Sequence, residues 1–221
     1  MVKIKKGDFI EVEYTGKTKE GIVFDTTDEQ IAKENKIHNK DASYGPIIIC
    51  IGESHIISGI DKRLQGKNIG EYDFEISQEE GFGKKTAKLF RLIPMSAFRN
   101  QDIQPFPGLQ VNIDGIIGVV KTVSGGRIIV DFNHPLAGKE LEYHIKINRL
   151  VEGIDEKIKG LIKLQFGLKD DDFSVVIKDD NAEVILNKNE INIPEEIQKI
   201  FKEKAIKLTE VKDITFIKNN N

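Results

Sequence analysis

The stretch DFNHPLAGKELEYHIKI, residues 131–147, joins a turn to a strand. Asn133, His134 and Pro135 belong to residue types and sequence contexts that favour turns. Apolar and polar side chains then alternate from Leu141 onward, which indicates a strand with one buried face. The stretch therefore predicts a corner at which the chain enters a sheet. We interpret His134 as a turn residue, because no Ser, Asp or Glu partner is identifiable that would make it a catalytic base.

Three earlier segments supply strands for the same sheet. The opening segment alternates apolar and charged residues through Tyr14, breaks at a glycine and resumes to Phe24, as a β-hairpin does. Residues 47–51 form a short apolar run, and residues 72–76 alternate again. Together these segments predict an antiparallel sheet that residues 131–147 complete.

One helix is expected with this sheet. Residues 54–64 follow a glycine turn and end before Gly66, and glycine favours the carboxyl end of a helix. Three isoleucines are predicted to share one face of it: Ile56, Ile57 and Ile60. Residues 28–35 contain good helix formers within a polar segment, which predicts one or two helical turns in a loop.

The composition changes between residues 86 and 132. Turn signals at Asp114-Gly115 and Ser124-Gly125-Gly126 separate short apolar segments, and three of the six prolines fall here. The pattern predicts a compact β-rich domain inserted into the first one. The segment MSAF, residues 95–98, is expected to belong to its β-rich part.

A third unit begins after Gly153. Its pattern gives the order helix-strand-strand-helix-strand, with a hairpin about Asp180-Asn181 and a second helix that starts at Pro194. The apolar pattern of residues 155–218 is self-contained and predicts a unit that folds by itself. Asn219 to Asn221 are expected to form a disordered tail. The predicted fold class is α+β: an antiparallel sheet with one helix, a β-rich inserted domain and a small carboxy-terminal α/β domain.

The amino-acid composition limits which cellular location and which binding partners are expected. The 221 residues are 39% hydrophobic and 31% charged, which suits a folded chain with a core. No apolar run approaches the roughly 20 residues that span a bilayer, and the start MVKIKK lacks the features of a signal peptide, so we expect a cytoplasmic protein. A net charge of −3 attracts neither nucleic acid nor a membrane. The lysine-rich helix 198–207 also carries glutamates and is interpreted as a solvated face.

The cysteine and histidine content argues against a metal site. Cys50 is the single cysteine and lies in an apolar run, so a buried and inert thiol is expected. The four histidines are scattered without the spacing of zinc ligands: His38, His55, His134 and His144. We expect no metal and no cofactor.

An ordered set of motifs runs through residues 1 to about 152. It comprises Tyr14, GIVFD at 21–25, Gly52 with IISGI at 56–60, GFG at 81–83, and the segment from Asn133 to Tyr143. Any one of these motifs alone is weak evidence for a family. The order and spacing of the whole set resemble those of the FKBP-type peptidyl-prolyl isomerases. The insert is similar to the insert-in-flap domain of the SlyD-like branch, and the added carboxy-terminal domain is similar to the long archaeal form. The resemblance implies three domains: an FKBP-like isomerase domain (1–85 and 133–152), an insert-in-flap chaperone domain (86–132) and a carboxy-terminal α/β domain (153–221).

The resemblance also implies a proline pocket. The residues at the family's lining positions are Tyr14, Phe24, Asp25, Ile47, Ile56, Ile57, Ile60, Phe82 and Tyr143. Two of them differ from the family pattern. Ile60 replaces the tryptophan floor that eukaryotic members often have, and Phe82 replaces a tyrosine whose hydroxyl would donate to the substrate carbonyl. The first change keeps the floor apolar, whereas the second predicts reduced activity.

Such a pocket needs no nucleophile. Rotating a peptide bond costs about 18–20 kcal/mol in lost resonance, and an apolar site that binds the twisted state more tightly than either planar isomer lowers that barrier. The implied catalytic residues are Tyr14, Asp25 and Phe82, with Asp25 facing the rotating carbonyl carbon and hydrogen-bonded to Tyr14. On the residues alone, Asp25 also fits an Asx-turn before Thr26-Thr27. The apolar members of the set also fit an ordinary core.

Two functions from different classes follow. The first is an isomerase whose insert holds unfolded chains through five apolar side chains: Leu89, Phe90, Ile93, Met95 and Phe98. The second is a holdase with a vestigial proline pocket, which Phe82 favours. The expected partners are unfolded or partly folded polypeptides and proline peptides, without membrane or nucleic acid. The small carboxy-terminal domain leaves a sheet face or edge to cover, which favours pairing of two chains there.

Overall fold

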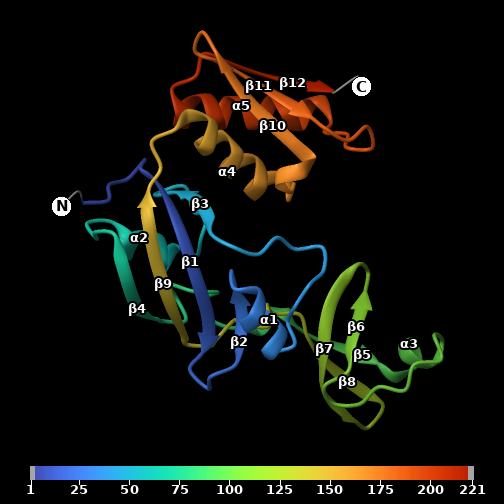
Figure 1. Ribbon diagram of the computed structural model, residues 1–221. Helices are drawn as coiled ribbons and strands as arrows, with labels where there is room; N and C mark the ends of the chain where they lie inside the picture. The colour runs from blue at the N-terminus through green and yellow to red at the C-terminus, as the bar shows by residue number, and fades with distance from the viewer. Residues whose placement is uncertain (1–2, 219–221) are drawn as a thin grey trace. The chain divides into compact units, whose positions relative to one another are not determined.

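The computed structural model describes residues 3–218, so the expected tail at Asn219 to Asn221 lies outside the described residues. The chain divides into two compact units. The first comprises Met1–Ile76 and Leu141–Asn221, and the second is Ser77–Glu140. Mostly antiparallel sheets combine with helices in both units, which confirms the α+β class (Figure 1). No helix among the described residues is long and apolar enough to cross a membrane.

A five-stranded sheet forms the base of the first unit. Its strands are β1 (Phe9–Thr18), β2 (Val23–Thr26), β3 (Ile47–Cys50), β4 (Gly70–Ile76) and β9 (Leu141–Leu150). The order is β2-β1-β9-β4, with β3 also paired to β1, and every pairing is antiparallel. β9 therefore lies between the first and the fourth strand in sequence (Figure 1). The corner predicted from residues 131–147 does lead into the centre of the sheet.

Alternation along β9 places one face in the core. Leu141, Tyr143, Ile145 and Ile147 are buried, and the residues between them are at least partly exposed. Helix α2 (Ser58–Leu64) contributes buried apolar side chains, including Ile60 and Leu64. The short helix α1 (Glu29–Glu34) begins at Asp28, whose side chain accepts the Ile31 N–H at 2.9 Å.

Helix α2 starts four residues later than the sequence predicts. Gly52 and Ser54 both have positive φ, 90° and 57°, so the segment before Ser58 turns instead of winding into a helix. Ile57 is the N-cap residue, with φ −53° and ψ 143°. The prediction that Ile56, Ile57 and Ile60 share a helical face is therefore wrong, because only Ile60 lies in the helix.

The second unit contains a four-stranded antiparallel sheet in the order β5-β8-β7-β6. Its elements are the 3₁₀ helix η1 (Ala87–Leu89), β5 (Phe90–Pro94), α3 (Met95–Arg99), β6 (Gln110–Ile113), β7 (Ile116–Ser124) and β8 (Arg127–Asp131). Both predicted glycine turns join strands: Asp114-Gly115 joins β6 to β7, and Gly125-Gly126 joins β7 to β8.

Two expectations for this unit need correction. MSAF lies in α3 rather than in a strand, because Pro94 ends β5 and serves as the N-cap of the helix. Phe98, predicted to be exposed, is 4% exposed and belongs to the core of the unit. Ile93 and Met95 are half-buried against the same core, whereas Leu89 and Phe90 are exposed.

Polar side chains hold together the two segments that enter and leave the insert. Asn133 Oδ1 accepts the Thr86 N–H at 2.7 Å, and Asn133 Nδ2 donates to the Thr86 carbonyl at 3.3 Å. Lys85 Nζ donates to Asp131 Oδ2 at 2.7 Å, and Asp131 is 4% exposed. This lysine and Asn133 hold the pKa of the Asp131 carboxyl below its usual value despite burial. The base of the insert is thus fixed by directional bonds.

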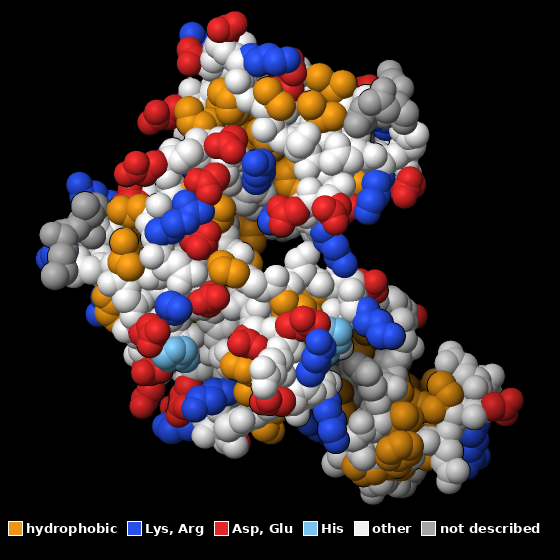
Figure 2. Space-filling model, viewed as in Figure 1, with side chains coloured by type: hydrophobic (Ala, Val, Ile, Leu, Met, Phe, Trp, Pro, Cys, Tyr) orange, Lys and Arg blue, Asp and Glu red, His pale blue; other side chains and the backbone are white. Residues whose placement is uncertain are grey.

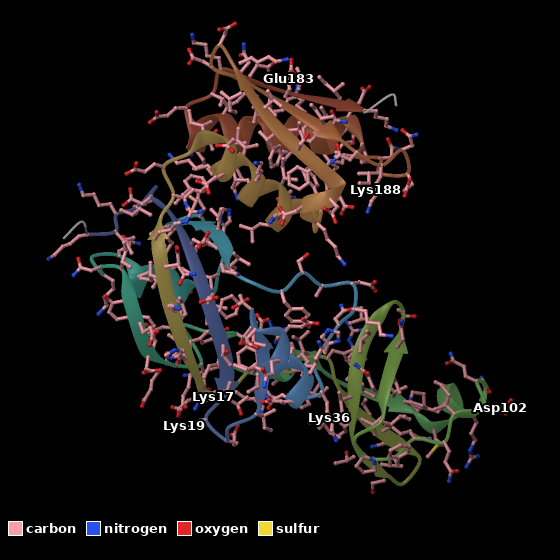
Figure 3. The ribbon with its side chains drawn as sticks, viewed as in Figure 1. Lys17, Lys19, Lys36, Asp102, Glu183 and Lys188 are labelled. Carbon is pink, nitrogen blue, oxygen red and sulfur yellow. The ribbon has the colours of Figure 1, made fainter. Side chains whose placement is uncertain are left out.

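The carboxy-terminal segment has the predicted order of elements. They are α4 (Ile154–Phe166), the 3₁₀ helix η2 (Asp170–Asp172), β10 (Phe173–Lys178), β11 (Asn181–Leu186), α5 (Glu195–Thr209) and β12 (Asp213–Lys218). β10 and β11 form the predicted hairpin, and β12 pairs with β11 in parallel. Lys188 and Glu183, labelled in Figure 3, form ion pairs with Asp172 and Lys178.

The core of this segment is shared with the five-stranded sheet. Phe9, Cys50 and Val151 belong to one buried cluster together with the apolar residues of α4, α5 and β10 to β12. Gly160 of α4 lies against Ile48 of β3, where a Cβ would come within 2.7 Å of the Ile48 Cβ. The core of residues 155–218 is therefore not self-contained, contrary to the expectation. Periodicity shows that a face is apolar, but it does not show what covers that face.

Candidate active site

Tyr14 and Asp25 meet across the first hairpin. Gly16 of β1 pairs with Asp25 of β2, which places the Asp25 side chain near Tyr14. Tyr14 Oη donates to Asp25 Oδ2 at 2.8 Å, as the sequence predicts. Asp25 lies inside β2 and is exposed to solvent. The Asx-turn interpretation therefore does not describe it.

The backbone of Tyr14 is fixed by two buried threonines. Its N–H donates to Thr27 Oγ1 at 2.9 Å, and its carbonyl accepts the Thr27 N–H at 2.9 Å. The Thr26 hydroxyl also donates to this carbonyl, at 3.1 Å. Thr26 and Thr27 are both 7% exposed. The tyrosine is thus held at its backbone and at its hydroxyl.

Aromatic rings surround the tyrosine–aspartate pair. The Tyr143 ring centroid lies 6.1 Å from that of Tyr14 and 5.8 Å from that of Phe24, the second pair meeting edge to face. Tyr143 comes from β9 and is 3% exposed. We call Tyr14, Phe24, Asp25 and Tyr143 the aromatic cluster. The structure brings these four predicted residues together.

Gly16 is a functional candidate that the sequence interpretation missed. A Cβ at this position would lie 2.9 Å from Phe24 Cζ and 2.9 Å from Tyr143 Cε1. The two rings therefore approach the strand closely only because Gly16 has no side chain. A glycine in the interior of a strand is a known sign of such close approach, so the signal was present in the sequence.

The environment keeps both tyrosines of the cluster protonated. Burial, and then the negative charge of Asp25, raise the pKa of Tyr14 far above its ordinary value. Burial and the same carboxylate raise the pKa of Tyr143. The Tyr14 hydroxyl therefore acts as a hydrogen-bond donor, and Asp25 is the carboxylate that accepts from it.

The four predicted isoleucines differ in exposure. Ile47 on β3 and the turn residues Ile56 and Ile57 are half-buried and keep some surface. Ile60 is 0% exposed, because its place in α2 faces the core of the unit. Ile60 thus has no free surface for a ligand in this structure, although it stays the predicted floor.

Phe82 lies in the second unit, outside the aromatic cluster. Its ring stacks on that of His134, with centroids 4.4 Å apart and planes 3° apart. His134 Nδ1 also accepts the Leu136 N–H at 3.2 Å. His134 is therefore a turn residue that supports Phe82. Among residues 3–218 no group of three or more His, Cys, Asp or Glu side chains is arranged to hold a metal.

Comparisons with known proteins show which family the chain resembles. The family model for the FKBP-type peptidyl-prolyl cis-trans isomerase matches residues 2–98, and that for the FKBP26 IF domain matches residues 91–136. A short-type peptidyl-prolyl cis-trans isomerase of Methanocaldococcus jannaschii is 37% identical over 145 residues, which cover 65% of this chain and 92% of that protein. The SlyD isomerase of Haemophilus influenzae is 25% identical over 162 residues, which cover 71% of this chain and 77% of that protein.

A third relative is the probable FKBP-type 16 kDa isomerase of Pseudomonas fluorescens. It is 32% identical over 108 residues, which cover 46% of this chain and 71% of that protein. The chain belongs to the FKBP-type peptidyl-prolyl cis-trans isomerases.

Proposed function

We propose that the aromatic cluster binds the proline ring of a client polypeptide in the cytoplasm and twists the X-Pro bond. The observation that carries this proposal is the Tyr14–Asp25 hydrogen bond at 2.8 Å beside the rings of Phe24 and Tyr143. In this proposal Ile47, Ile56 and Ile57, which keep some exposed surface, complete the apolar wall, whereas the buried Ile60 supports the wall from the core and does not contact the ligand.

In this proposal the chain's own groups favour the twisted bond over both planar isomers. Apolar rings strip water from the imide, which favours the twisted state because its carbonyl has less charge separation. Asp25 faces the rotating carbonyl carbon, and Tyr14 holds the carboxylate in place. Since the pKa of Tyr14 is raised, the hydroxyl keeps its proton throughout. No covalent intermediate is needed.

A proline tetrapeptide assay tests the proposal. Asp25→Ala and Phe24→Ala should lower kcat/KM, and Tyr14→Phe should lower it by about the two- to tenfold that loss of one hydrogen bond gives. Asp28→Ala is the matched control, because Asp28 is an exposed carboxylate three residues further on that caps α1. Equal rates for the Asp25→Ala and wild-type proteins would show that the site lies elsewhere.

We also propose that the insert binds unfolded clients, through a different surface from the one predicted. Four large apolar side chains, which we call the insert face, lie on one side of its sheet: Phe90, Leu92, Ile117 and Ile129. Leu92 is 58% exposed and Ile117 is 59% exposed. Figure 2 shows apolar side chains gathered on this unit. An exposed apolar patch of this kind favours a protein-binding role.

Refolding of a proline-limited protein tests the insert face. Leu92→Ser with Ile117→Ser should slow catalysed refolding while leaving the tetrapeptide rate unchanged, because the client is then no longer held near the site. Ile22→Ser is the control, since Ile22 is 61% exposed in the hairpin of the first unit. If the double variant refolds clients at the wild-type rate, the insert face has no client-binding role.

The alternative proposal is a holdase with a vestigial pocket. The observations that favour it are the exposed insert face and the phenylalanine at position 82. A holdase predicts suppressed client aggregation together with tetrapeptide rates at the uncatalysed level. The tetrapeptide rate of the wild-type chain separates the two proposals. A vestigial site gives the uncatalysed rate, whereas an active site accelerates isomerisation and loses that acceleration in Asp25→Ala.

Pairing of two chains through the carboxy-terminal segment is a further part of the proposal. Val176 and Ile217 are 37% and 42% exposed on the sheet of β10 to β12. Light scattering of the full-length chain and of Val176→Glu measures the mass directly. A monomer mass for the full-length chain would rule out pairing.

A further inference from the structure

A cavity of about 230 Å³ lies within the first unit, where the turn before α2 meets α4 and α5. Its polar side chains are Ser54, His55, Gln165 and Lys204, and apolar residues of α4 and α5 form the rest of its wall. None of these residues belongs to the aromatic cluster. Holding one water takes about 10–15 Å³, so the cavity has room for a ligand of several heavy atoms.

The hydrogen bonds of His55 fix where its proton lies. Nδ1 accepts the backbone N–H of Cys50 at 3.1 Å, so this nitrogen carries no proton and the neutral ring carries its hydrogen on Nε2. Burial, followed by the positive charge of Lys204, lowers the pKa of His55, while Glu53 and Asp61 act in the opposite direction. The ring is therefore neutral, with Nε2–H as its one donor.

The Nε2–H of His55 lies next to a second hydrogen-bond donor, the Lys204 ammonium group. His55 Nε2 lies 3.2 Å from Lys204 Nζ, and an ammonium group can only donate. The two groups cannot satisfy each other, but an oxygen atom with negative charge can accept from both. The printed hydrogen bonds of the Asp61 carboxylate go elsewhere, to the Gly52 N–H at 2.9 and 3.1 Å.

The backbone holds His55 in this position under strain. Ser54 has a φ of 57°, a left-handed conformation that is uncommon for a residue with a side chain. The turn that Ser54 makes places His55 between β3 and α2.

We propose that this cavity binds a small oxyanion, a phosphate or a carboxylate, between His55 Nε2–H and Lys204 Nζ. The apolar residues of α4 and α5 lower the polarity around both donors, which strengthens both bonds. Such a ligand would join α5 to the turn that carries Ile56 and Ile57. The inference does not depend on where proline peptides bind.

The test uses the full-length, isotope-labelled chain. Sodium phosphate and sodium acetate are titrated separately against sodium chloride of equal ionic strength, while NMR follows the Cys50 amide and His55 Nε2. We expect saturable shifts with phosphate, acetate or both, and the comparison identifies which oxyanion is preferred. Lys204→Met should weaken binding by at least about tenfold, the effect of losing one charge-assisted hydrogen bond, and Lys204→Arg should retain it.

Lys207→Met is the matched control, because Lys207 is an exposed lysine three residues further along α5. It should bind as the wild type does. The absence of a saturable shift in the wild type with either salt overturns the proposal, whatever the variants do. Equal affinity in Lys204→Met and wild type also overturns it. Neither readout requires isomerase activity, so failure here is distinct from failure of the proposed function.

Discussion

The packing of the aromatic cluster depends on the absence of a side chain at Gly16. A methyl group there would lie 2.9 Å from both Phe24 Cζ and Tyr143 Cε1, so Gly16→Ala forces at least one ring to move. Overpacking of this kind costs about 1–3 kcal/mol. We predict a loss of that size in the free energy of unfolding and a fall in kcat/KM on a proline tetrapeptide.

Chemical denaturation and the peptide assay measure the two effects of Gly16→Ala. Lys17→Ala serves as the control, because Lys17 is the exposed neighbour whose partner is Glu142 on β9. Wild-type values for both quantities in Gly16→Ala would show that the rings move freely and that their packing does not shape the site.

Alkaline pH should destabilise the protein through Tyr14. Its pKa in the folded chain is raised above the ordinary value of 10.0, so folding favours the protonated form. This contribution is fully present below pH 10 and is lost as the pH rises above it, because the unfolded chain then releases the proton first. We predict that the free energy of unfolding falls less steeply above pH 10 in Tyr14→Phe than in the wild type. Parallel curves, measured by denaturation at successive pH values, would contradict this.

At the scale of elements, local patterns predicted strands better than helix limits. Alternation located β1, β4 and β9, because one face of each strand must be buried. The start of α2 was predicted four residues too early. Ser54 has a positive φ, and nothing in the sequence indicates that this serine adopts such a backbone conformation. Helix α3 was missed because five residues are too few for a helical period. Its Phe98 is buried by the folding of the insert, which no count of apolar residues reveals.

The contact of α4 with β3 is a specific junction between elements. Gly160→Ala would place a methyl group 2.7 Å from Ile48 Cβ, and the Ile48 carbonyl lies 3.3 Å away. Alanine favours helix over glycine by about 1 kcal/mol, so an open site would gain stability from this change. We predict the opposite sign, a net loss in the free energy of unfolding, because the helix must move off the strand. Lys159→Ala, on a partly exposed position of α4, is the control. A Gly160→Ala variant with a higher free energy of unfolding than the wild type would show that α4 and β3 are not closely packed here.

At the scale of the whole molecule, the site depends on residues far apart in the sequence. Family motifs predicted the hydrogen bond between Tyr14 and Asp25 that the structure contains, since both residues lie in one hairpin. The same motifs could not show that Ile60 has no exposed surface or that Phe82 stacks on His134, because both depend on packing between distant segments. The shared core was missed for the same reason. Phe9 looks like an ordinary strand residue until α4 and the carboxy-terminal sheet cover it.

Removing residues 153–221 should therefore separate stability from activity. The short-type relative matches over 92% of its own length and 65% of this chain, so it has no counterpart to about a third of the chain. We expect the truncated chain to isomerise tetrapeptides at low temperature. It should also melt at a lower temperature, because truncation exposes Phe9, Ile48 and Cys50, which α4 and its neighbours otherwise cover. Calorimetry and the peptide assay measure both effects.

A polar replacement of Ile48 tests the shared core in both the truncated and the full-length chain. Ile48→Thr in the truncated chain replaces an apolar side chain that has lost its cover, so it should reduce aggregation measured by light scattering. In the full-length chain the same change should destabilise, because Ile48 packs against the buried cluster and against Gly160. Opposite effects in the two chains are the signature of a core shared across the junction. A truncated chain that melts at the full-length temperature would contradict that shared core, since the carboxy-terminal segment would then contribute nothing to the stability of the sheet.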